Sequence, residues 1–400
     1  MTAPKLRFKE FNGDWSKITL GDYSETITSG SRDWAQYYSD SGDKFIRMTN
    51  LVRDGINLDL SDLKYVKLPD DSNEGKRTNL KSGDILISIT AELGKLGWIP
   101  DGLGTAYINQ HTALVRMKEI CDSKFIAYGL STEKYNNKLN SLNDSGAKAG
   151  LNLGTIRNFE VIIPSKKEQT KIASFLSAVD EKISQLSQKL HLLGQYKQGM
   201  MQKLFSQQIR FKADDGSEFG EWEEKELKDV VEINPKAKKL PENFIYIDLE
   251  SVEKGRLLLQ KNIALQDAPS RAQRLLAKGD VLFQMVRPYQ QNNYYFNLSG
   301  EYVASTGYAQ IRTKLDSKFI YYALHEKTFL DEVMNRCTGT SYPAINSSDL
   351  SSIEILIPCL EEQTKIANFL SAIDQKIDVV SEQLEQAKLW KKGLLQQMFV

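Results

Sequence analysis

An internal repeat constrains the fold of this chain more than any other feature of its sequence. Residues 164–186 read PSKKEQTKIASFLSAVDEKISQL, and residues 358–380 read PCLEEQTKIANFLSAIDQKIDVV. The two segments lie 194 residues apart (358 − 164) and are identical at 14 of 23 positions. Self-similarity at a fixed offset indicates that one structural unit occurs twice. The fold must therefore contain two copies of this segment.

Weaker similarities at nearly the same offset extend over the rest of the chain. The matching pairs are Arg7-Phe8 and Arg210-Phe211, Trp15 and Trp222, Ser82–Ile87 and Lys278–Phe283, Asp122–Ile126 and Asp316–Ile320, and Gly146–Asn152 and Gly339–Asn346. We predict a domain at 1–163, a helical segment at 164–207, a second domain at 208–357 and a second helical segment at 358–400. The helical segments stay alike while the domains differ. This is typical of one framework with two specificities, although a duplicated protein with uneven drift is the alternative.

Both helical segments carry a heptad pattern of apolar residues, which predicts a coiled coil. The predicted seam is Ile172, Leu176, Val179, Ile183, Leu186 and Leu190 in the first segment and Ile366, Leu370, Ile373, Ile377, Val380 and Leu384 in the second. Each helix would have about 40 residues and a length of about 60 Å. Pairing between the two helices is favoured over packing of each helix on its own domain, because the 3.5-residue period of apolar residues continues over several heptads.

Lys197 and Lys391 interrupt the two seams at matching positions. A polar seam residue can fix the register of a coiled coil, and a lysine near a helix end can instead extend to solvent. Within one chain the two helices are expected to pair antiparallel. The predicted fold class is thus α+β, with two mixed α/β domains joined by two long helices that form an antiparallel coiled coil in a pseudo-two-fold arrangement.

Each domain should combine short strands with a few helices. The apolar runs 85–90 and 281–285 predict buried strands, and 125–131 and 319–326 predict helices. Polar loops follow each strand and precede Asn152 and Asn346. Arginine pairs with guanine in the major groove, asparagine and glutamine pair with adenine, and small residues let the backbone approach phosphates. The candidate DNA-binding residues are Lys95, Lys148 and Asn152 in the first half and Arg287, Tyr289, Gln290, Gln291, Asn292, Asn293, Ser341, Tyr342 and Asn346 in the second. Ordinary solvent-exposed loops are the alternative.

Composition limits the remaining classes of protein. A formal net charge of zero argues mildly against a DNA-binding protein, although net charge does not report local fields and a partner subunit can supply contacts to phosphates. No apolar run approaches the ~20 residues that span a membrane, and the first residues lack the apolar core of an export signal. Cys121, Cys337 and Cys359 are widely separated, so we expect reduced, buried thiols in a cytoplasmic protein.

No motif for catalysis or metal binding stands out. A glycine-rich cofactor loop, a GxxxxGK[ST] phosphate loop and an Asn/Asp-Pro-Pro-aromatic motif are all missing from the sequence. Pro69-Asp70 with Glu74-Gly75-Lys76 imitates a nuclease signature, but its two parts are too close to place converging carboxylates on adjacent strands. The histidines are isolated from one another. We therefore expect no catalytic residue and no metal site, and the two diverged domains argue against a purely structural rod protein.

The repeated EQTKIAxFLSAxD motif, at Glu168–Asp180 and Glu362–Asp374, resembles the conserved regions of type I restriction–modification specificity subunits. The Gly-Asp strands, the loops before Asn152 and Asn346 and the duplication of the whole chain fit the same family. The resemblance implies two target-recognition domains, each binding one half of an asymmetric, interrupted double-stranded DNA sequence. It also implies that the helices separate the domains and dock two modification subunits.

The resemblance further implies where the chemistry of such a system takes place. The modification subunits would bind S-adenosylmethionine and methylate adenine, and restriction subunits would use ATP and Mg²⁺ to translocate and cleave DNA. The specificity subunit itself would hold no cofactor, and no membrane is implied. No catalytic residue carries over, because the specificity subunit of this family has none. No base-contacting residue carries over either, because the recognition domains vary widely.

Overall fold

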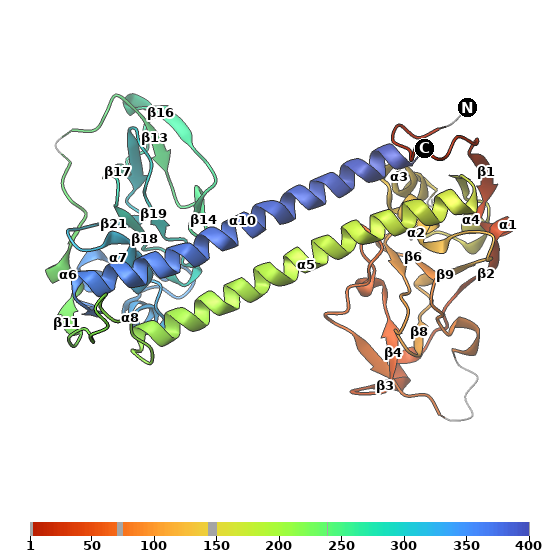
Figure 1. Cartoon of the computed structure of the whole chain (residues 1–400), viewed down its shortest axis with the longest axis horizontal. Helices are drawn as coiled ribbons and strands as arrows, with labels where there is room; N and C mark the ends of the chain where they lie inside the picture. The colour runs from red at the N-terminus through yellow and green to blue at the C-terminus, as the bar shows by residue number, and fades with distance from the viewer. Residues whose placement is uncertain (1–2, 70–74, 143–149, 238, 400) are drawn as a thin grey trace. The chain divides into compact units, whose positions relative to one another are not determined.

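The computed structural model describes residues 3–69, 75–142, 150–237 and 239–399. The chain forms two compact units (Figure 1). Unit 1 comprises residues 1–186 and 383–400, and unit 2 comprises residues 187–382. Both unit boundaries lie inside long helices, α5 (Lys166–Phe205) and α10 (Leu360–Met398). Each unit therefore contains one mixed domain, the first half of one long helix and the second half of the other.

The domain of unit 1 is built on a four-stranded antiparallel sheet in the order β2-β9-β6-β7. A second sheet in the order β3-β5-β4-β8 contains a parallel pair, β4 with β8. The strands are β1 (Ser16–Thr19), β2 (Ser24–Ser29), β3 (Tyr38–Ser39), β4 (Asp43–Ile46), β5 (Lys64–Val66), β6 (Ile85–Ser88), β7 (Leu96–Trp98), β8 (Ala106–Ile108), β9 (Thr112–Met117) and β10 (Glu160–Ile163). The helices are α1 (Leu20–Tyr23), α2 (Ser123–Ser131), α3 (Glu133–Ser141) and α4 (Leu153–Arg157), with 3₁₀ turns η1 (Trp34–Tyr37), η2 (Met48–Asn50) and η3 (Lys76–Thr78).

The domain of unit 2 repeats this plan. Its sheet β12-β21-β18-β19 corresponds to β2-β9-β6-β7, and its sheet β16-β13-β20-β17 again has a parallel pair, β13 with β20. The strands are β11 (Glu223–Glu226), β12 (Val231–Ile233), β13 (Asn243–Ile247), β14 (Val252–Glu253), β15 (Arg256–Leu257), β16 (Lys261–Ala264), β17 (Ala272–Leu275), β18 (Val281–Gln284), β19 (Tyr294–Tyr295), β20 (Tyr302–Ser305), β21 (Tyr308–Thr313) and β22 (Glu354–Ile357). The helices are α6 (Leu227–Val230), α7 (Ser317–Ala323), α8 (Lys327–Arg336) and α9 (Ser347–Ser351), with 3₁₀ turns η4 (Leu265–Asp267) and η5 (Pro288–Gln290).

The Gly-Asp turn that precedes each central strand explains why that motif recurs. Gly83 and Gly279 have φ values of +84° and +94°, which an L side chain rarely adopts. The following aspartates are buried, and Asp84 accepts hydrogen bonds from Arg116 at 2.7 Å, as Asp280 does from Arg312 at 2.8 and 2.7 Å. The predicted strands are confirmed as β6 and β18, whose residues are all buried. The predicted domain helices are confirmed as α2 and α7.

The predicted seams lie on the inward faces of α5 and α10. Nine of the twelve seam residues are buried, and Ile183, Leu190 and Ile377 are half-buried. The core of unit 1 takes Ile172 and Leu176 from the start of α5 and Leu394 and Met398 from the end of α10. The core of unit 2 takes Ile366 from the start of α10 and Leu204 from the end of α5, among others. Each unit thus pairs the start of one helix with the end of the other, as an antiparallel coiled coil requires.

The two seam lysines each pair with an aspartate of the opposite helix. In unit 2, Lys197 Nζ lies 2.6 Å from Asp374, which also accepts a hydrogen bond from Tyr322 at 2.7 Å. In unit 1, Lys391 pairs with Asp180, which accepts a hydrogen bond from Tyr128 at 2.7 Å. Burial and the neighbouring aspartate raise the pKa of both tyrosines, so their hydroxyls stay protonated donors. Each seam lysine therefore joins the two long helices through an ion pair, at matching positions of the two units.

The first residues of the repeated motif fasten each long helix to its own domain. Glu168 accepts two hydrogen bonds from Arg7, at 2.7 and 2.8 Å, and Glu362 accepts two from Arg210, at 3.1 and 2.6 Å. The adjacent glutamines accept from backbone N–H groups before α2 and α7, and their amides donate to Pro164 O and Pro358 O. Buried charges need such partners, and this accounts for the identity of the motif in both copies.

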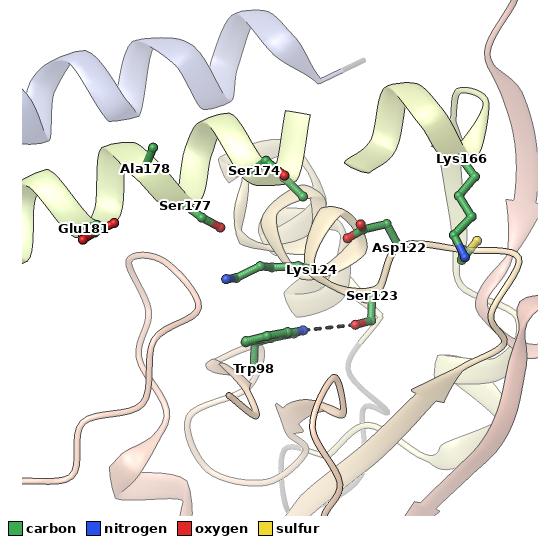
Figure 2. A pocket seen from close by; sticks show the side chains of 11 residues that line it. Trp98, Asp122, Ser123, Lys124, Lys166, Ser174, Ser177, Ala178 and Glu181 are labelled. Carbon is green, nitrogen blue, oxygen red and sulfur yellow. Dashed lines mark hydrogen bonds between the residues drawn. The ribbon is translucent and has the colours of Figure 1, made fainter. Parts of the chain in front are cut away.

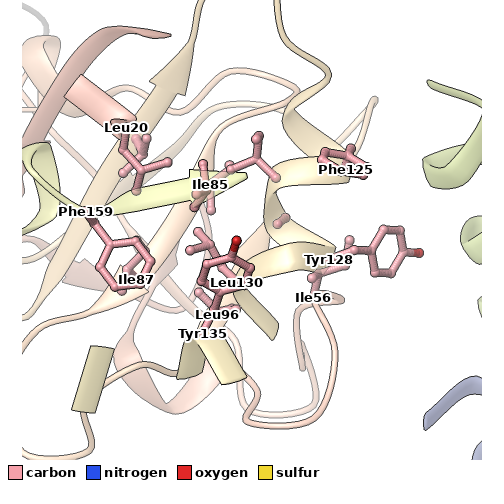
Figure 3. Packing of buried hydrophobic residues seen from close by; sticks show 14 of the residues in the cluster. Leu20, Ile56, Ile85, Ile87, Leu96, Phe125, Tyr128, Leu130, Tyr135 and Phe159 are labelled. Atoms are coloured by element: carbon pink, nitrogen blue, oxygen red, sulfur yellow. The ribbon is translucent and has the colours of Figure 1, made fainter. Parts of the chain in front are cut away.

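The hydrophobic core of unit 1 lies between the antiparallel sheet and the helices that cover it (Figure 3). Ile85 and Ile87 of β6 face Leu130 of α2 and Tyr135 of α3 in this cluster. Phe125 packs against Phe399 with ring centroids 5.0 Å apart. Phe399, which directly follows α10, therefore completes the core of the first domain.

In unit 1, a hydrogen bond joins the segment before β1 to the end of α10. In unit 2, the equivalent hydrogen bond joins two segments that follow each other directly in the chain. Leu6 N donates to Gln397 O at 2.9 Å, and Ile209 N donates to Lys203 O at 3.2 Å. Gln397 and Lys203 are equivalent in the repeat, since they lie 194 residues apart (397 − 203). The end of α10 thus takes the place in unit 1 that the end of α5 takes in unit 2.

The thiols only partly match the expectation of burial. Cys121 is buried, which raises the pKa of its thiol to about 11. Cys337 is half-buried, and Cys359 is exposed because it lies in the turn that leads into α10. All three are free. None of the helices in the described parts of the chain is long and apolar enough to cross a membrane.

Candidate nucleic-acid interface

The loop that follows β18 is shaped from inside by polar side chains. Gln284, at the end of the strand, accepts a hydrogen bond from Asn292 N at 3.0 Å and donates to Val286 O at 2.8 Å. Arg287 and Gln291 adopt left-handed backbone conformations, with φ of 54° and 51°, on either side of η5. A loop with this many internal hydrogen bonds holds its outward side chains in defined positions.

Several predicted DNA-binding side chains are part of this internal network. Asn293 is 1% exposed and accepts a hydrogen bond from Gln284 N, while Asn292 accepts one from Lys254 N. Gln291 donates to His325 O at 3.5 Å, and Gln290 accepts from Gln284 at 2.9 Å. These residues build the loop, and contact between any of them and DNA stays a prediction.

His325 supports the same loop from beneath, and sequence reasoning missed it. Its Nδ1 lies 2.7 Å from Tyr321 O and its Nε2 lies 3.3 Å from Asn293 Nδ2. Burial lowers the pKa of His325 to about 4, so the ring is neutral at pH 7. A neutral ring with the proton on Nδ1 satisfies both partners. An isolated histidine that follows a helix gives no sequence signal for this role.

The two loops predicted in the second half form one surface. Val286 and Ala344 form an isolated antiparallel β-bridge, and Arg287 N donates a hydrogen bond to Pro343 O at 2.7 Å. The Arg287 guanidinium lies 4.2 Å from the centre of the Tyr342 ring. We call the outward side chains of the two loops the two-loop surface: Arg287, Tyr289, Gln290, Ser341 and Tyr342. Tyr289 and Tyr342 are 51% and 63% exposed.

The chemistry of the two-loop surface suits a nucleic acid. It presents a guanidinium, two tyrosine rings, an amide and a hydroxyl, and it includes no carboxylate. Guanidinium and amide groups are the ones that bind base edges in the major groove, and aromatic rings pack on sugars and bases. The surface therefore has the groups that a DNA-contacting loop requires.

Unit 1 brings its two corresponding loops together in the same way. Thr90 and Gly150 form an antiparallel β-bridge, like Val286 and Ala344 in unit 2. Ser88 stands at the position of Gln284, and its hydroxyl accepts a hydrogen bond from Lys95 N at 2.8 Å. Ala91, with φ of 57°, stands where unit 2 has Arg287. Lys95 pairs with Glu92 at 2.6 Å, and contact between Lys95 and DNA stays a prediction. Lys148 lies outside the residues that the structure describes.

Asn152 and Asn346, both predicted to contact DNA, have a structural role at equivalent positions. Each is the N-cap of a short helix: Asn152 accepts a hydrogen bond from Thr155 N and Asn346 accepts one from Asp349 N, both at 2.8 Å. A capping asparagine satisfies a backbone N–H that the helix leaves free. This role explains their recurrence without a ligand, and their contact with DNA remains a prediction.

A cavity of about 620 Å³ lies on unit 1 away from these loops (Figure 2). Trp98 of β7, Ser123 and Lys124 of α2, and Ser177 and Glu181 of α5 are among its lining residues. Trp98 donates to Ser123 at 3.1 Å, and the Lys124 ammonium lies 4.3 Å from the Trp98 ring centre. None of the predicted DNA-binding residues lines it. Among the described residues no group of three or more side chains is arranged to hold a metal ion.

Comparison with known proteins agrees with this architecture. A family model of the type I restriction modification DNA specificity domain matches residues 12–193 and again residues 220–389. The MjaVIII specificity subunit of a type I restriction enzyme from Methanocaldococcus jannaschii is 26% identical over 97% of this chain and 94% of that protein. The putative MjaX specificity subunit of the same organism is 27% identical over 98% of this chain and 94% of that protein.

Solved structures share the fold. The S subunit of a type I restriction–modification system from M. genitalium aligns with a TM-score of 0.66 and 16% identity, covering 100% of this chain and 99% of that one. A chain from a structural study of assembly in the type I R-M system aligns with a TM-score of 0.54 and 16% identity, covering 98% of both. The family model matches both halves of the sequence, so this chain belongs to the family of type I restriction–modification DNA specificity proteins.

Proposed function

We propose that this chain is the DNA-recognition subunit of a type I restriction–modification complex. Each unit binds one half of an asymmetric, interrupted double-stranded target, and the long helices join the two units and dock two modification subunits. The chain itself performs no reaction, so the purified subunit alone should methylate no DNA. S-adenosylmethionine, ATP and Mg²⁺ act in the modification and restriction subunits. Such a complex works in the cytoplasm, where its DNA lies.

One observation carries this proposal: the same framework occurs twice and presents two different loop surfaces. The framework pairs are matched residue by residue, as in Asp84 with Arg116 and Asp280 with Arg312. The loops on top of it differ in chemistry, with Ala91 at the position of Arg287. Two identical surfaces would bind two identical half-sites, whereas two different ones favour an asymmetric target.

The balanced charge of the chain is consistent with this role. Many lysines and arginines of the described residues pair with carboxylates inside each unit, as Arg210 does with Glu362. Phosphate contacts supply much of the affinity of DNA-binding proteins. We infer that the modification subunits provide part of the positive surface, and that this chain contributes mainly selectivity.

An exchange of domains tests the proposal. Residues 1–163 are replaced with the first domain of another family member, and the chain is co-expressed with the modification subunit of its own system. Sequencing of methylated bases in the genome should show that one half of the target changes and the other is retained. Arg7 must be kept, because Glu168 would otherwise lose its buried partner.

A matched control replaces residues 164–186 with the second copy, 358–380. The motif contacts are the same in both copies, so both half-sites should stay unchanged. Loss of both half-sites after the domain exchange, in a complex that still assembles and methylates, would rule out independent recognition by the two domains.

A further inference from the structure

We propose that Arg287 recognises a guanine in the half-site bound by unit 2, and that Tyr342 is the positioning residue that orients it. This inference rests on the proposed function and extends it to one base pair. It follows from four features of the loop: the backbone at Arg287, the ring beside its guanidinium, the absence of an acidic partner in the described structure, and the difference from unit 1.

The backbone at Arg287 is fixed in a conformation that few arginines adopt. Its φ of 54° lies in the left-handed region, which is unfavourable for a residue other than glycine. Neighbouring contacts hold it there: Arg287 N donates to Pro343 O, Val286 bridges Ala344, and Pro288 is buried. Ala91 has nearly the same φ at the equivalent position of unit 1, so this conformation belongs to the repeated loop and sets the direction of whichever side chain stands there. The conformation directs the side chain toward the second loop.

The Tyr342 ring holds the guanidinium from one side. Arg287 Cζ lies 4.2 Å from the ring centre, within the range of a cation–π contact. Tyr342 is 63% exposed and belongs to none of the hydrophobic clusters formed by the described residues. Its ring therefore contributes little to the core of unit 2. Its effect is to restrict the planar guanidinium to one orientation, which reduces the entropy lost on binding.

The guanidinium of Arg287 is available to a ligand. Arg210, Arg312 and two further arginines of unit 2 pair with acids, whereas no ion pair is seen for Arg271 or Arg274 among the described residues. Within the described residues, Arg287 pairs with no carboxylate, and its Nε is covered and without a hydrogen-bond partner. The two terminal Nη groups remain, and end-on they match O6 and N7 of guanine. A phosphate contact would need charge but not this fixed orientation.

Unit 1 lacks this feature at the equivalent position. Ala91 has nearly the same φ, 57°, and follows the Thr90–Gly150 bridge as Arg287 follows the Val286–Ala344 bridge. The alanine side chain has no hydrogen-bonding group and so cannot pair with guanine O6 and N7. Changes at Arg287 should therefore affect one half-site and leave the other intact.

The test uses the complete complex of this chain with the modification subunit of its own system. The methylated target is determined for the wild type and for Arg287→Ala, Arg287→Lys, Tyr342→Ala and Tyr342→Phe. Arg287→Ala and Arg287→Lys should lower the preference for one G·C pair about 5- to 150-fold, the equivalent of about 1–3 kcal/mol. Tyr342→Ala should lower the same preference less, and Tyr342→Phe should retain it because the ring remains.

The outcomes separate this inference from the proposed function. Arg271→Ala, which removes an exposed arginine of the same unit, should leave every base preference unchanged. An Arg287→Ala complex that loses methylation equally at all sequences would show a phosphate contact and overturn the inference, as would an unchanged target. Equal damage by Tyr342→Phe and Tyr342→Ala would overturn the positioning role. Two other results would contradict the proposed function itself: a wild-type target that is not bipartite, or a target whose first half does not change when the first domain is exchanged.

Discussion

Residues that are identical in the two repeats form hydrogen bonds, helix caps and ion pairs with other residues of the chain. Glu362 is fully buried and accepts hydrogen bonds from Arg210 and also from Trp222, at 3.1 Å. Asn152 and Asn346 cap helices, and Tyr128 and Tyr322 hold the aspartates of the helix pair. Residues that differ between the repeats, such as Ala91 and Arg287, lie on the loop surfaces. At the scale of residues, identity therefore marks the framework, and the recognition role of Arg287 belongs to the proposal above.

His325 should make unit 2 sensitive to acid. Its folded pKa is about 4, whereas the unfolded chain binds the proton near pH 6.5. Between these values the unfolded state binds more protons, so the free energy of unfolding should fall by about 1–3 kcal/mol as the pH drops from 6.5 to 4. Urea unfolding of the wild type and His325→Gln at several pH values measures this.

His191→Gln is the matched control for the acid sensitivity, because His191 is exposed on α5. It should show the same pH dependence as the wild type, and His325→Gln should show a weaker one. A His325→Gln variant with the wild-type slope between pH 4 and 6.5 would assign the acid sensitivity to other groups.

At the scale of elements, the paired lysine and aspartate decide how α5 and α10 meet. An apolar seam alone tolerates a shift by a heptad, because every a and d position accepts a similar side chain. A shift would separate Lys391 from Asp180 and Lys197 from Asp374, and each lysine would lose its aspartate. The polar positions therefore select one register from several that the apolar residues allow.

A double-mutant cycle measures this selection. Lys391→Met, Asp180→Asn and the double variant should give a coupling energy of about 1–3 kcal/mol, because the side chains are 13% and 10% exposed. Lys197 and Asp374 are 24% and 31% exposed, so the same cycle there should give a smaller value, about 0.5–1 kcal/mol. The measurement is the free energy of unfolding in urea. A coupling near zero at Lys391 and Asp180 would show that the apolar seam alone sets the register.

At the scale of the whole molecule, the repeat is closed by the chain ends. Leu6 N and Gln397 O form in unit 1 the contact that Ile209 N and Lys203 O form in unit 2. Both helices therefore begin in one unit and end in the core of the other. Any change in the length of one helix must be matched in the other, since each is anchored at both ends.

Lengthening both helices by one heptad tests their role in spacing the half-sites. Second copies of residues 187–193 and 381–387 are inserted after Leu193 and Ala387, which preserves the seam. Seven residues add about 10 Å, or up to about three base pairs at ~3.4 Å each. Sequencing of methylated bases should show a longer unspecified spacer and unchanged half-sites.

Insertion into α5 alone is the control for the lengthened helices. With unequal helices, Lys197–Asp374 and Lys391–Asp180 cannot both form, so this variant should lose stability and assembly. A wild-type spacer in an active complex with both insertions would mean that something other than these helices positions the domains.

The sequence by itself determined the duplication, the two long helices, their seams and the central strand of each domain. These features are encoded locally: a heptad period specifies a face of a helix, and an apolar run after Gly-Asp specifies a buried strand. The heptad pattern also predicted that the two helices pair as a coiled coil. The antiparallel direction was expected because the two helices belong to one chain.

Only the tertiary structure decided what the polar residues do. It turned Asn292 and Asn293 inward, assigned Asn152 and Asn346 to helix caps, paired Lys95 with Glu92 and placed Tyr342 against Arg287. A hydrogen bond between residues far apart in the chain produces no repeating sequence pattern from which it could be predicted. The same asparagine satisfies a loop, a helix end or a base edge equally well, so its role depends on which partners the fold brings within about 3 Å.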